Sequence, residues 1–211
     1  MIVSLKMFKD KLKTSIATQK ETQAIICLVI GHSKKSKGAY NKNLDISEYD
    51  LNKQEAIRVH EILKEQGIRS IVIHRKELKD LPKKINKHNP RFIISFHHNS
   101  FSETSTGSET LYYHSSTKGK HLAEVIQRNI VSVLGYKDRG IRPKCSEDRG
   151  GFLLRYTNAP CIILEPCFIS NTKELKDFIL KQDLYIEAIV AGIKEFIGLS
   201  IKHTQSMKRL T

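Results

Sequence analysis

Apolar and polar residues follow two patterns along the chain: short, nearly continuous apolar runs, and longer stretches in which apolar residues recur every three to four positions. The short runs predict strands at 25–30, 70–74, 92–97, 109–113 and 161–165. The longer stretches predict helices at 48–66, 118–134, 172–180 and 183–197, with a short helix near 80–88. Strands that alternate with helices indicate an α/β fold. We expect a single domain with a mainly parallel, twisted sheet of about five to six strands, flanked by helices.

The two ends of the chain differ from this domain, which we place at residues 24–198. Residues 1–23 are polar and basic, with apolar positions spaced as in an amphipathic helix. Such an arm either packs on the domain or frays, and weak contact with a membrane or a cell wall is the alternative. Residues 199–211 form a short polar tail.

Positive charge is the extreme feature of the composition. The 211 residues include 36 Lys and Arg against 22 Asp and Glu, which gives a formal net charge of +14. The charge is spread along the chain, and the chain has neither an arginine-rich helix nor the aromatic-interleaved strands of nucleic-acid-binding domains. We therefore expect nonspecific attraction to a polyanion and no specific nucleic-acid partner.

The sequence also bears on cellular location. No apolar run approaches the ~20 residues that span a bilayer, and the apolar start of the chain is shorter than the core of a secretory signal. The four cysteines form no C-x-x-C pair, which favours reduced thiols over a disulfide framework. We expect a cytoplasmic protein that leaves the cell on lysis or by a route other than Sec.

Four polar residues stand where predicted strands end or a predicted helix begins: His32, Glu48, His97 and Glu165. In an open parallel sheet, groups at the carboxyl ends of the strands converge on one crevice. Two His and one Glu are a ligand set of catalytic zinc sites, which keep a fourth position open for water. A further carboxylate can then act as the base for that water. The pattern predicts a zinc hydrolase, although Glu48 taken alone fits a simpler role in the first turn of a capped helix.

Four motifs in sequence order strengthen this interpretation. They are Gly31-His32 with Gly38-Ala39, then Glu48-x-Asp50-x-Asn52, then Ser95-Phe96-His97-x-Asn99-Ser100, and finally Pro160-x-Ile162-x-Leu164-Glu165-x-x-Phe168-Ile169-Ser170-Asn171. With these motifs the chain resembles the zinc-dependent N-acetylmuramoyl-L-alanine amidases of bacterial cell-wall turnover and phage lysis. The resemblance runs from about residue 25 to about residue 197.

The resemblance implies roles for particular residues. His32, Glu48 and His97 would bind Zn²⁺, and Glu165 would be the catalytic carboxylate. His98 departs from the family, which often has a small residue there, and strand alternation by itself does not decide between His97 and His98. His98 is then a residue behind the metal ligands, a substrate contact or a packed core residue.

Three further residues lie within the motif neighbourhoods. Asn99, Arg142 and Arg155 are candidates for contact with the glycan lactyl group or the stem peptide, with surface solvation as the alternative for each.

The resemblance favours an enzyme that cleaves the amide between N-acetylmuramic acid and L-alanine of peptidoglycan, as a monomeric phage or prophage endolysin. Its positive charge would attract anionic cell-wall polymer. The alternatives are a zinc carboxypeptidase acting on stem peptides and a host amidase in wall remodelling. A basic nucleic-acid-binding protein or an inactive wall-binding relative would leave the ordered His and Glu residues unexplained.

Overall fold

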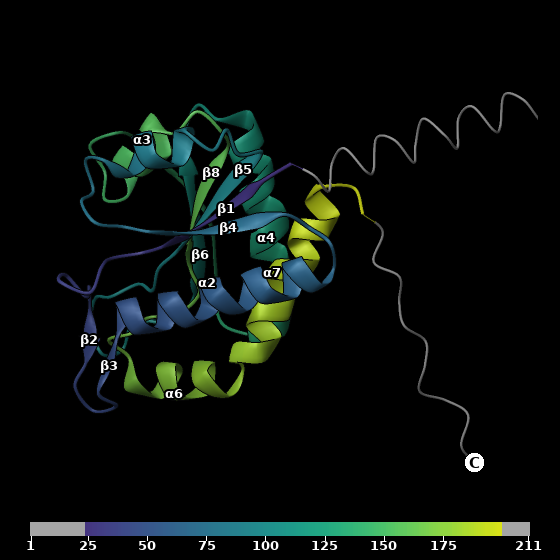
Figure 1. Cartoon of the computed structure of the whole chain (residues 1–211). Coiled ribbons are helices and arrows are strands. Elements are labelled where there is room, and N and C mark those ends of the chain that lie inside the picture. Colours follow the sequence, from purple (N-terminus) through teal and green to yellow (C-terminus); the bar gives the residue numbers. More distant parts are fainter. Residues whose placement is uncertain (1–23, 200–211) are drawn as a thin grey trace, which may run out of the picture.

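The central element of the protein is a six-stranded sheet with the strand order β4-β1-β5-β8-β6-β7 (Figure 1). Its strands are β1 (Ile26–Ile30), β4 (Ser70–His74), β5 (Phe92–Phe96), β6 (Ser108–Tyr113), β7 (Asp138–Lys144) and β8 (Cys161–Glu165). Four neighbouring strands, β4, β1, β5 and β8, are parallel, whereas β6 pairs antiparallel with β8 and parallel with β7. The predicted α/β fold with a mainly parallel sheet is confirmed.

The computed structural model describes residues 24–199. The predicted arm at 1–23 and all but the first residue of the predicted tail lie outside the described residues. Within 24–199, none of the helices combines the length and the apolar character that a membrane span requires.

Helices cover both faces of the sheet. The helices are α2 (Glu48–Glu65), α3 (Leu81–Asn86), α4 (Thr117–Leu134), α5 (Gly151–Tyr156), α6 (Thr172–Leu180) and α7 (Gln182–Phe196). Residues of α2, α4, α6 and α7 share one hydrophobic core with one face of the sheet, and residues of α3 and α5 share a second, smaller core with the other face. Figure 1 shows α3 on the opposite side of the sheet from α2 and α7.

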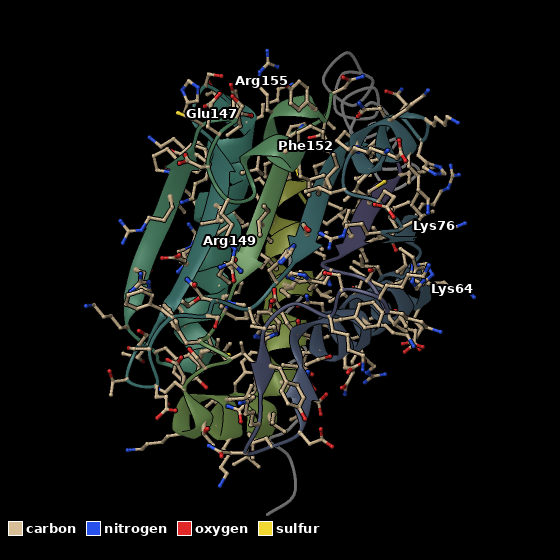
Figure 2. The ribbon with its side chains drawn as sticks, turned by 90° about the vertical axis from the view of Figure 1, so that its left-hand side faces the viewer. Lys64, Lys76, Glu147, Arg149, Phe152 and Arg155 are labelled. Carbon is tan, nitrogen blue, oxygen red and sulfur yellow. The ribbon has the colours of Figure 1, made fainter. Side chains whose placement is uncertain are left out.

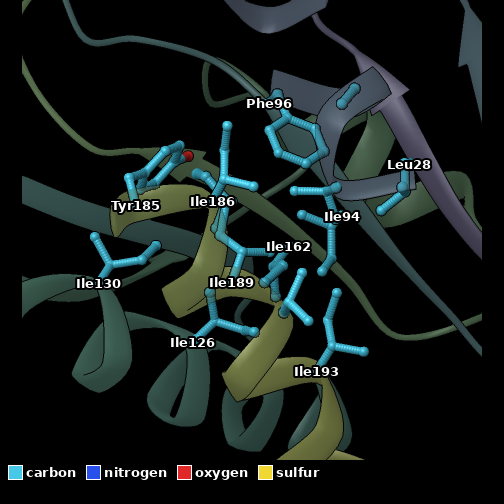
Figure 3. Close-up of a cluster of buried hydrophobic side chains, with 14 of the residues drawn as sticks. Leu28, Ile94, Phe96, Ile126, Ile130, Ile162, Tyr185, Ile186, Ile189 and Ile193 are labelled. Carbon is cyan, nitrogen blue, oxygen red and sulfur yellow. The ribbon is translucent and has the colours of Figure 1, made fainter. Parts of the chain in front are cut away.

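Strand alternation divides the side chains of β5 between these two cores. Phe92, Ile94 and Phe96 belong to the larger core, where Ile94 and Phe96 lie among the isoleucines of α7 (Figure 3). Ile93 belongs to the smaller core, and Ser95 faces the same side. Every residue of β5 is buried, as the apolar run predicts for a strand covered on both faces.

The strands and helices expected from the apolar pattern are present, with ends that differ by no more than one residue, except for the short α3, whose ends differ by one and two residues. The pattern did not predict β7, α5 or the small β2 (Tyr40–Asn41) and β3 (Ile46–Ser47) hairpin. The strand β7 has no apolar run because it lies at the sheet edge, where its charged residues and Pro143 are tolerated. The helix α5 is as short as α3, and it follows Gly150 and begins with Gly151, a residue type that disfavours helices.

The register of the central strands determines where the functional groups emerge. Phe96 of β5 pairs with Ile30 of β1 on one side and with Leu164 of β8 on the other. The three parallel strands therefore end at the same level. The residues that follow them, and the first turn of α2, meet at this carboxyl edge of the sheet.

Candidate metal centre and active site

Three side chains from separate elements come together at the carboxyl edge of the sheet. His32 follows β1, His97 follows β5 and Glu48 opens α2, and one ligand atom from each lies within 4.8 Å of the others. The Nδ1 atom of His97 is 2.9 Å from Oε1 of Glu48, and Nε2 of His32 is 3.0 Å from Oε2 of the same carboxylate. The carboxylate of Glu48 thus lies between the two imidazoles.

The backbone holds Glu48 in this position. Ser47 caps α2, and its hydroxyl accepts a hydrogen bond from the amide of Asp50. The amides of Ala39 and His98 donate to the two oxygens of Glu48, at 3.1 and 3.2 Å. The predicted capping of this helix is present, yet the Glu48 side chain is fully buried and faces the two histidines instead of solvent.

Two glycines allow the chain to pass close behind these ligands. A Cβ atom at Gly31 would lie 2.6 Å from the ring of His97, and one at Gly38 would lie 2.5 Å from Oε2 of Glu48. Gly38 and His32 both have positive φ angles, 78° and 65°. A positive φ is uncommon for a residue with a side chain and costs conformational energy, so the surrounding structure must enforce it at His32.

The protonation states at this cluster suit a metal ion. Burial disfavours the charge of Glu48, but the hydrogen bond from His97 and the close contact and charge of both imidazoles outweigh it and hold the pKa of Glu48 well below the usual range. Burial lowers the pKa of His97, against the opposing effect of Glu48. An ionised carboxylate and a neutral imidazole are the forms that coordinate metals.

His32 supplies a direct test of whether the residues fit a metal. Both of its ring nitrogens are buried without a hydrogen-bond partner among the residues described, because the approach of Nε2 to Glu48 lacks hydrogen-bond geometry. An unpaired buried polar atom is costly, and coordination of a cation would use such a nitrogen lone pair. The set of two imidazoles and one carboxylate therefore fits a divalent cation of the zinc type.

A second carboxylate lies at the end of the next strand. Glu165 ends β8 and is only 5% exposed, and its Oε2 has no hydrogen-bond partner in the described part of the chain. Burial raises its pKa well above the usual range, and the negative charges of Glu48 and Glu109 act in the same direction. The positive charge of Arg149 opposes them. Such a carboxyl group retains a proton more readily than one in water.

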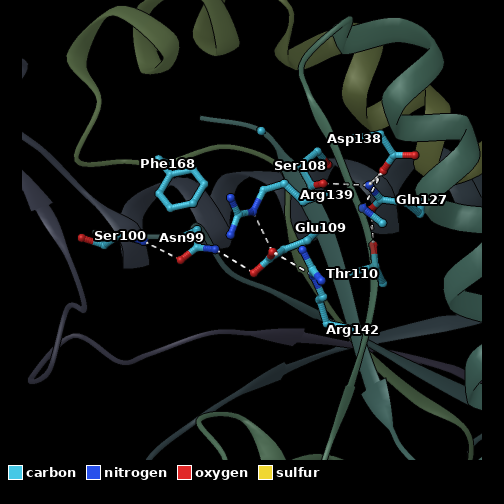
Figure 4. Close-up of polar contacts among 12 residues, drawn as sticks. Asn99, Ser100, Ser108, Glu109, Thr110, Gln127, Asp138, Arg139, Arg142 and Phe168 are labelled. Carbon is cyan, nitrogen blue, oxygen red and sulfur yellow. Dashed lines mark hydrogen bonds and ion pairs between the residues drawn. The ribbon is translucent and has the colours of Figure 1, made fainter. Parts of the chain in front are cut away.

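Two of the predicted substrate contacts meet at Glu109 on β6 (Figure 4). Asn99 donates to one oxygen of Glu109 at 2.9 Å, and Arg139 donates to the other at 2.7 Å. The guanidinium of Arg142 is 3.6 Å from the second oxygen and remains half exposed. Asn99 is thus held by protein groups, and Arg142 has donors that still face solvent.

The third predicted contact lies elsewhere. The guanidinium of Arg155 lies over the rings of Tyr113 and Tyr156, at 5.6 and 5.7 Å from their centres. Figure 2 shows Arg155 at the opposite end of α5 from Arg149, which lies near the carboxyl end of β8. The structure brings Arg149, and not Arg155, to the cluster.

Two buried polar residues near the ligands, Glu55 and Ser95, were not among the predicted site residues, and Glu55 contacts His98. The ring of His98 is fully buried, with Nε2 3.0 Å from Oε1 of Glu55 and Nδ1 3.3 Å from the sulfur of Cys167. Glu55 could have been noticed as a carboxylate in the buried stripe of α2. Ser95 could have been noticed as the one polar residue in the apolar run of β5.

Comparison with known proteins identifies the family. The model of the family described as N-acetylmuramoyl-L-alanine amidase matches residues 26–197, which is most of the chain. This chain belongs to the N-acetylmuramoyl-L-alanine amidase family. The family match covers the same elements that carry the His and Glu cluster.

Individual relatives agree with this assignment to the amidase family. An amidase from Clostridium difficile 630 is 29% identical, with a TM-score of 0.77 over 84% of this chain and 98% of that chain. The catalytic domain of the amidase CwlV from Bacillus (Paenibacillus) polymyxa var. colistinus is 27% identical, with a TM-score of 0.75 over 84% of this chain and 100% of that chain. The amidase LytC of Bacillus subtilis is 26% identical over 86% of this chain, but the match spans only 37% of LytC.

Proposed function

We propose that this amidase-family domain hydrolyses the amide bond between N-acetylmuramic acid and L-alanine in peptidoglycan, with zinc bound by His32, Glu48 and His97. The observation that carries the proposal is the convergence of these three ligand atoms within 4.8 Å at the sheet edge that also presents Glu165. Family membership over residues 26–197 supports the choice of bond.

The chain's own residues provide positioning and proton transfer. When bound, zinc supplies a Lewis acid that lowers the pKa of water and polarises a carbonyl. The carboxylate of Glu165 accepts the proton of the attacking water and later delivers it to the nitrogen of the departing alanine. Its raised pKa suits this task, because a group that both takes and releases a proton works best when its pKa lies near the working pH.

The test of this proposal replaces Glu165 by Gln, which keeps the shape of the side chain and removes the proton acceptor. We expect the rate of peptidoglycan hydrolysis to fall by ~10²–10⁴-fold while the protein still binds one zinc per chain. Glu147→Gln is the matched control, because Glu147 is an exposed loop carboxylate. This variant should hydrolyse peptidoglycan at the rate of the unmodified protein. Unchanged hydrolysis by Glu165→Gln would overturn the assigned role.

The products distinguish the amidase from its enzymatic alternative. Mass spectrometry of digested peptidoglycan should show peptides with a free N-terminal alanine and glycan without peptide. A stem-peptide carboxypeptidase would instead produce new carboxyl termini and leave the peptides on the glycan. The same digest of the Glu165→Gln variant serves as the blank.

The lytic role, the cytoplasmic residence before lysis and the monomeric state stay predictions. If the role is lytic, expression of the chain in bacteria should be harmless until the membrane is permeabilised, and culture turbidity should then fall. A remodelling amidase would alter cell separation without such treatment. Sedimentation of the purified protein measures the oligomeric state.

A further inference from the structure

A recess of about 310 Å³ opens beside the metal ligands on the face of the sheet that α3 and α5 cover. His32 and His97 form one side of it. Its remaining walls are mostly apolar and include Leu78, Leu81, Phe152 and Leu153. Its volume is at the lower end of the ~300–1,000 Å³ range of ligand pockets, which suits a small group next to the reacting bond.

Two arginines line this mostly apolar recess. The guanidinium groups of Arg75 and Arg149 form no hydrogen bond or ion pair with any other residue in 24–199. The charge of Arg149 lies close enough to lower the pKa values of both His97 and Glu165. The carboxylate of Asp148 also lines the recess, but it accepts a hydrogen bond at 2.7 Å from the amide of Cys145. Carboxylates such as Glu48 and Glu165 act on these cations from a distance, but neither guanidinium is in direct contact with a carboxylate within residues 24–199.

A buried hydroxyl group faces the same space. Ser95 lines the recess from β5, its side chain is fully buried, and its Oγ atom has no hydrogen-bond partner in the described residues. A buried polar group without a partner costs free energy. A ligand with a polar group in the recess would provide that partner.

We propose that this recess binds the first two residues of the stem peptide, a deeper assignment that rests on the proposed function. The apolar walls take the methyl side chain of L-alanine, and Ser95 bonds a peptide group of the occupant. Arg149, with Arg75, binds the free carboxylate of the acidic residue that follows the alanine.

Charge decides between the peptide side and the sugar side of the substrate. Once its lactyl carboxyl group is in amide linkage, a muramic acid unit carries no charge that would attract two arginines. The second residue of the stem peptide keeps a free carboxylate when it is glutamate, and it is neutral when it is amidated. Arginine binds carboxylates through paired, charge-assisted hydrogen bonds, so the recess fits the peptide side and the acidic form.

The experiment compares two soluble muramoyl peptides that differ only in this group, one with a carboxylate and one with a primary amide. The unmodified protein should cleave the carboxylate form with a kcat/KM about 10- to 100-fold higher, the range expected for a charge-assisted hydrogen bond. Arg149→Gln should reduce this ratio toward one. Because both substrates use the same Glu165 in the same variant, any effect of Arg149 on that carboxyl group cancels in the ratio.

Arg58→Gln is the matched control, since Arg58 is an exposed arginine of α2 whose one ion pair within residues 24–199 is a 3.4 Å contact with Glu61. Its substrate ratio should equal that of the unmodified protein. Equal cleavage of both substrates by the unmodified protein, or an unchanged ratio in Arg149→Gln, would overturn the assignment while leaving the amidase function standing. Failure to cleave either substrate at the muramoyl amide would instead contradict the proposed function.

Ser95→Ala gives an independent readout. We expect weaker binding of the dipeptide L-alanyl-D-glutamate by calorimetry and no loss of thermal stability, because the hydroxyl has no partner within the described protein to lose. Unchanged dipeptide affinity, or a clear loss of stability, would show that this hydroxyl serves the fold and not the recess.

Discussion

Glu165 is a carboxyl group in an environment very different from water. It is buried at the end of β8, one of its oxygens is unpaired, and two other carboxylates, Glu48 and Glu109, raise its pKa further. The fold tolerates this unfavourable arrangement at the edge of the sheet where the metal ligands meet. Strain of this kind at a candidate site is typical of residues kept for chemistry and not for stability.

The raised pKa of Glu165 makes a prediction about the metal-free protein. The folded state binds this proton more tightly than the unfolded state does, so stability falls as pH rises above the ordinary pKa of ~4.3. Glu165→Gln should therefore be more stable than its parent at pH 8, by about 1–3 kcal/mol. The gain should shrink through pH 4 and vanish by about pH 3, where the parent carboxyl group is protonated in both states. Urea denaturation with a chelator across this pH range measures it, and a gain that is constant with pH would contradict the argument.

His98 and Glu55 form a buried pair behind the ligand cluster. Gln182 also donates to Glu55 at 3.3 Å, and the backbone amide of His98 donates to the ligand Glu48. Removing one partner of such a pair leaves a buried carboxylate without its main contact, which typically costs 3–5 kcal/mol.

We therefore expect His98→Ala to lower the free energy of unfolding by about 3–5 kcal/mol. The double variant with Glu55→Leu should cost less than the sum of the two single changes, because the unpaired carboxylate is gone. His60→Ala is the control, since His60 is only partly buried and its side chain has one hydrogen bond within residues 24–199, to Ser70. Additive effects at 55 and 98 would show that the pair is not coupled.

At the scale of elements, the segment between β1 and α2 depends on glycines to approach the ligands. Gly38 has a positive φ of 78° and no room for a side chain beside Glu48 and His32. Gly67 has a similar φ of 72°, yet a Cβ atom there would meet nothing within 4 Å. The two positions share a conformational demand and differ in their surroundings.

This contrast gives a matched pair of variants. Gly38→Ala and Gly67→Ala should both lose about 1 kcal/mol of stability from the positive φ. Only Gly38→Ala should also lose bound zinc, because its methyl group displaces the ligands. Zinc content measured after gel filtration tests this, and full zinc content in Gly38→Ala would contradict it.

The elements also show where sequence patterns suffice. The apolar runs of β1, β5 and β8 and the repeats of α2, α4, α6 and α7 were predictable, because burial against a sheet requires those patterns. The strand β7 and the helix α5 were not, since β7 is a charged edge strand and α5 is a six-residue helix that begins with glycine. The strand β7 carries Arg139 and Arg142, and Arg149 lies just before α5. The groups around the ligands were therefore the least predictable part of the site.

At the scale of the whole molecule, the net charge of +14 predicts how the protein meets its substrate. Attraction between exposed charges is screened over ~10 Å at 0.1 M salt and over ~3 Å at 1 M. Binding to purified walls should therefore fall steeply over this range, and it should be weak on walls stripped of anionic polymer. Cleavage of a small soluble muramoyl peptide should change little with salt. Salt-insensitive wall binding would contradict a role for charge.

The sequence by itself determined the strands, the main helices and the family, and it pointed to His32, Glu48, His97 and Glu165, because each follows or begins a strongly patterned element. The tertiary structure alone decided which other residues surround them. Arg149 reaches the cluster and Arg155 does not, and the hydroxyl of Ser95 faces a recess. These placements depend on how strands align in register and how loops pack over the sheet edge, and such contacts between distant residues leave no local pattern in the sequence.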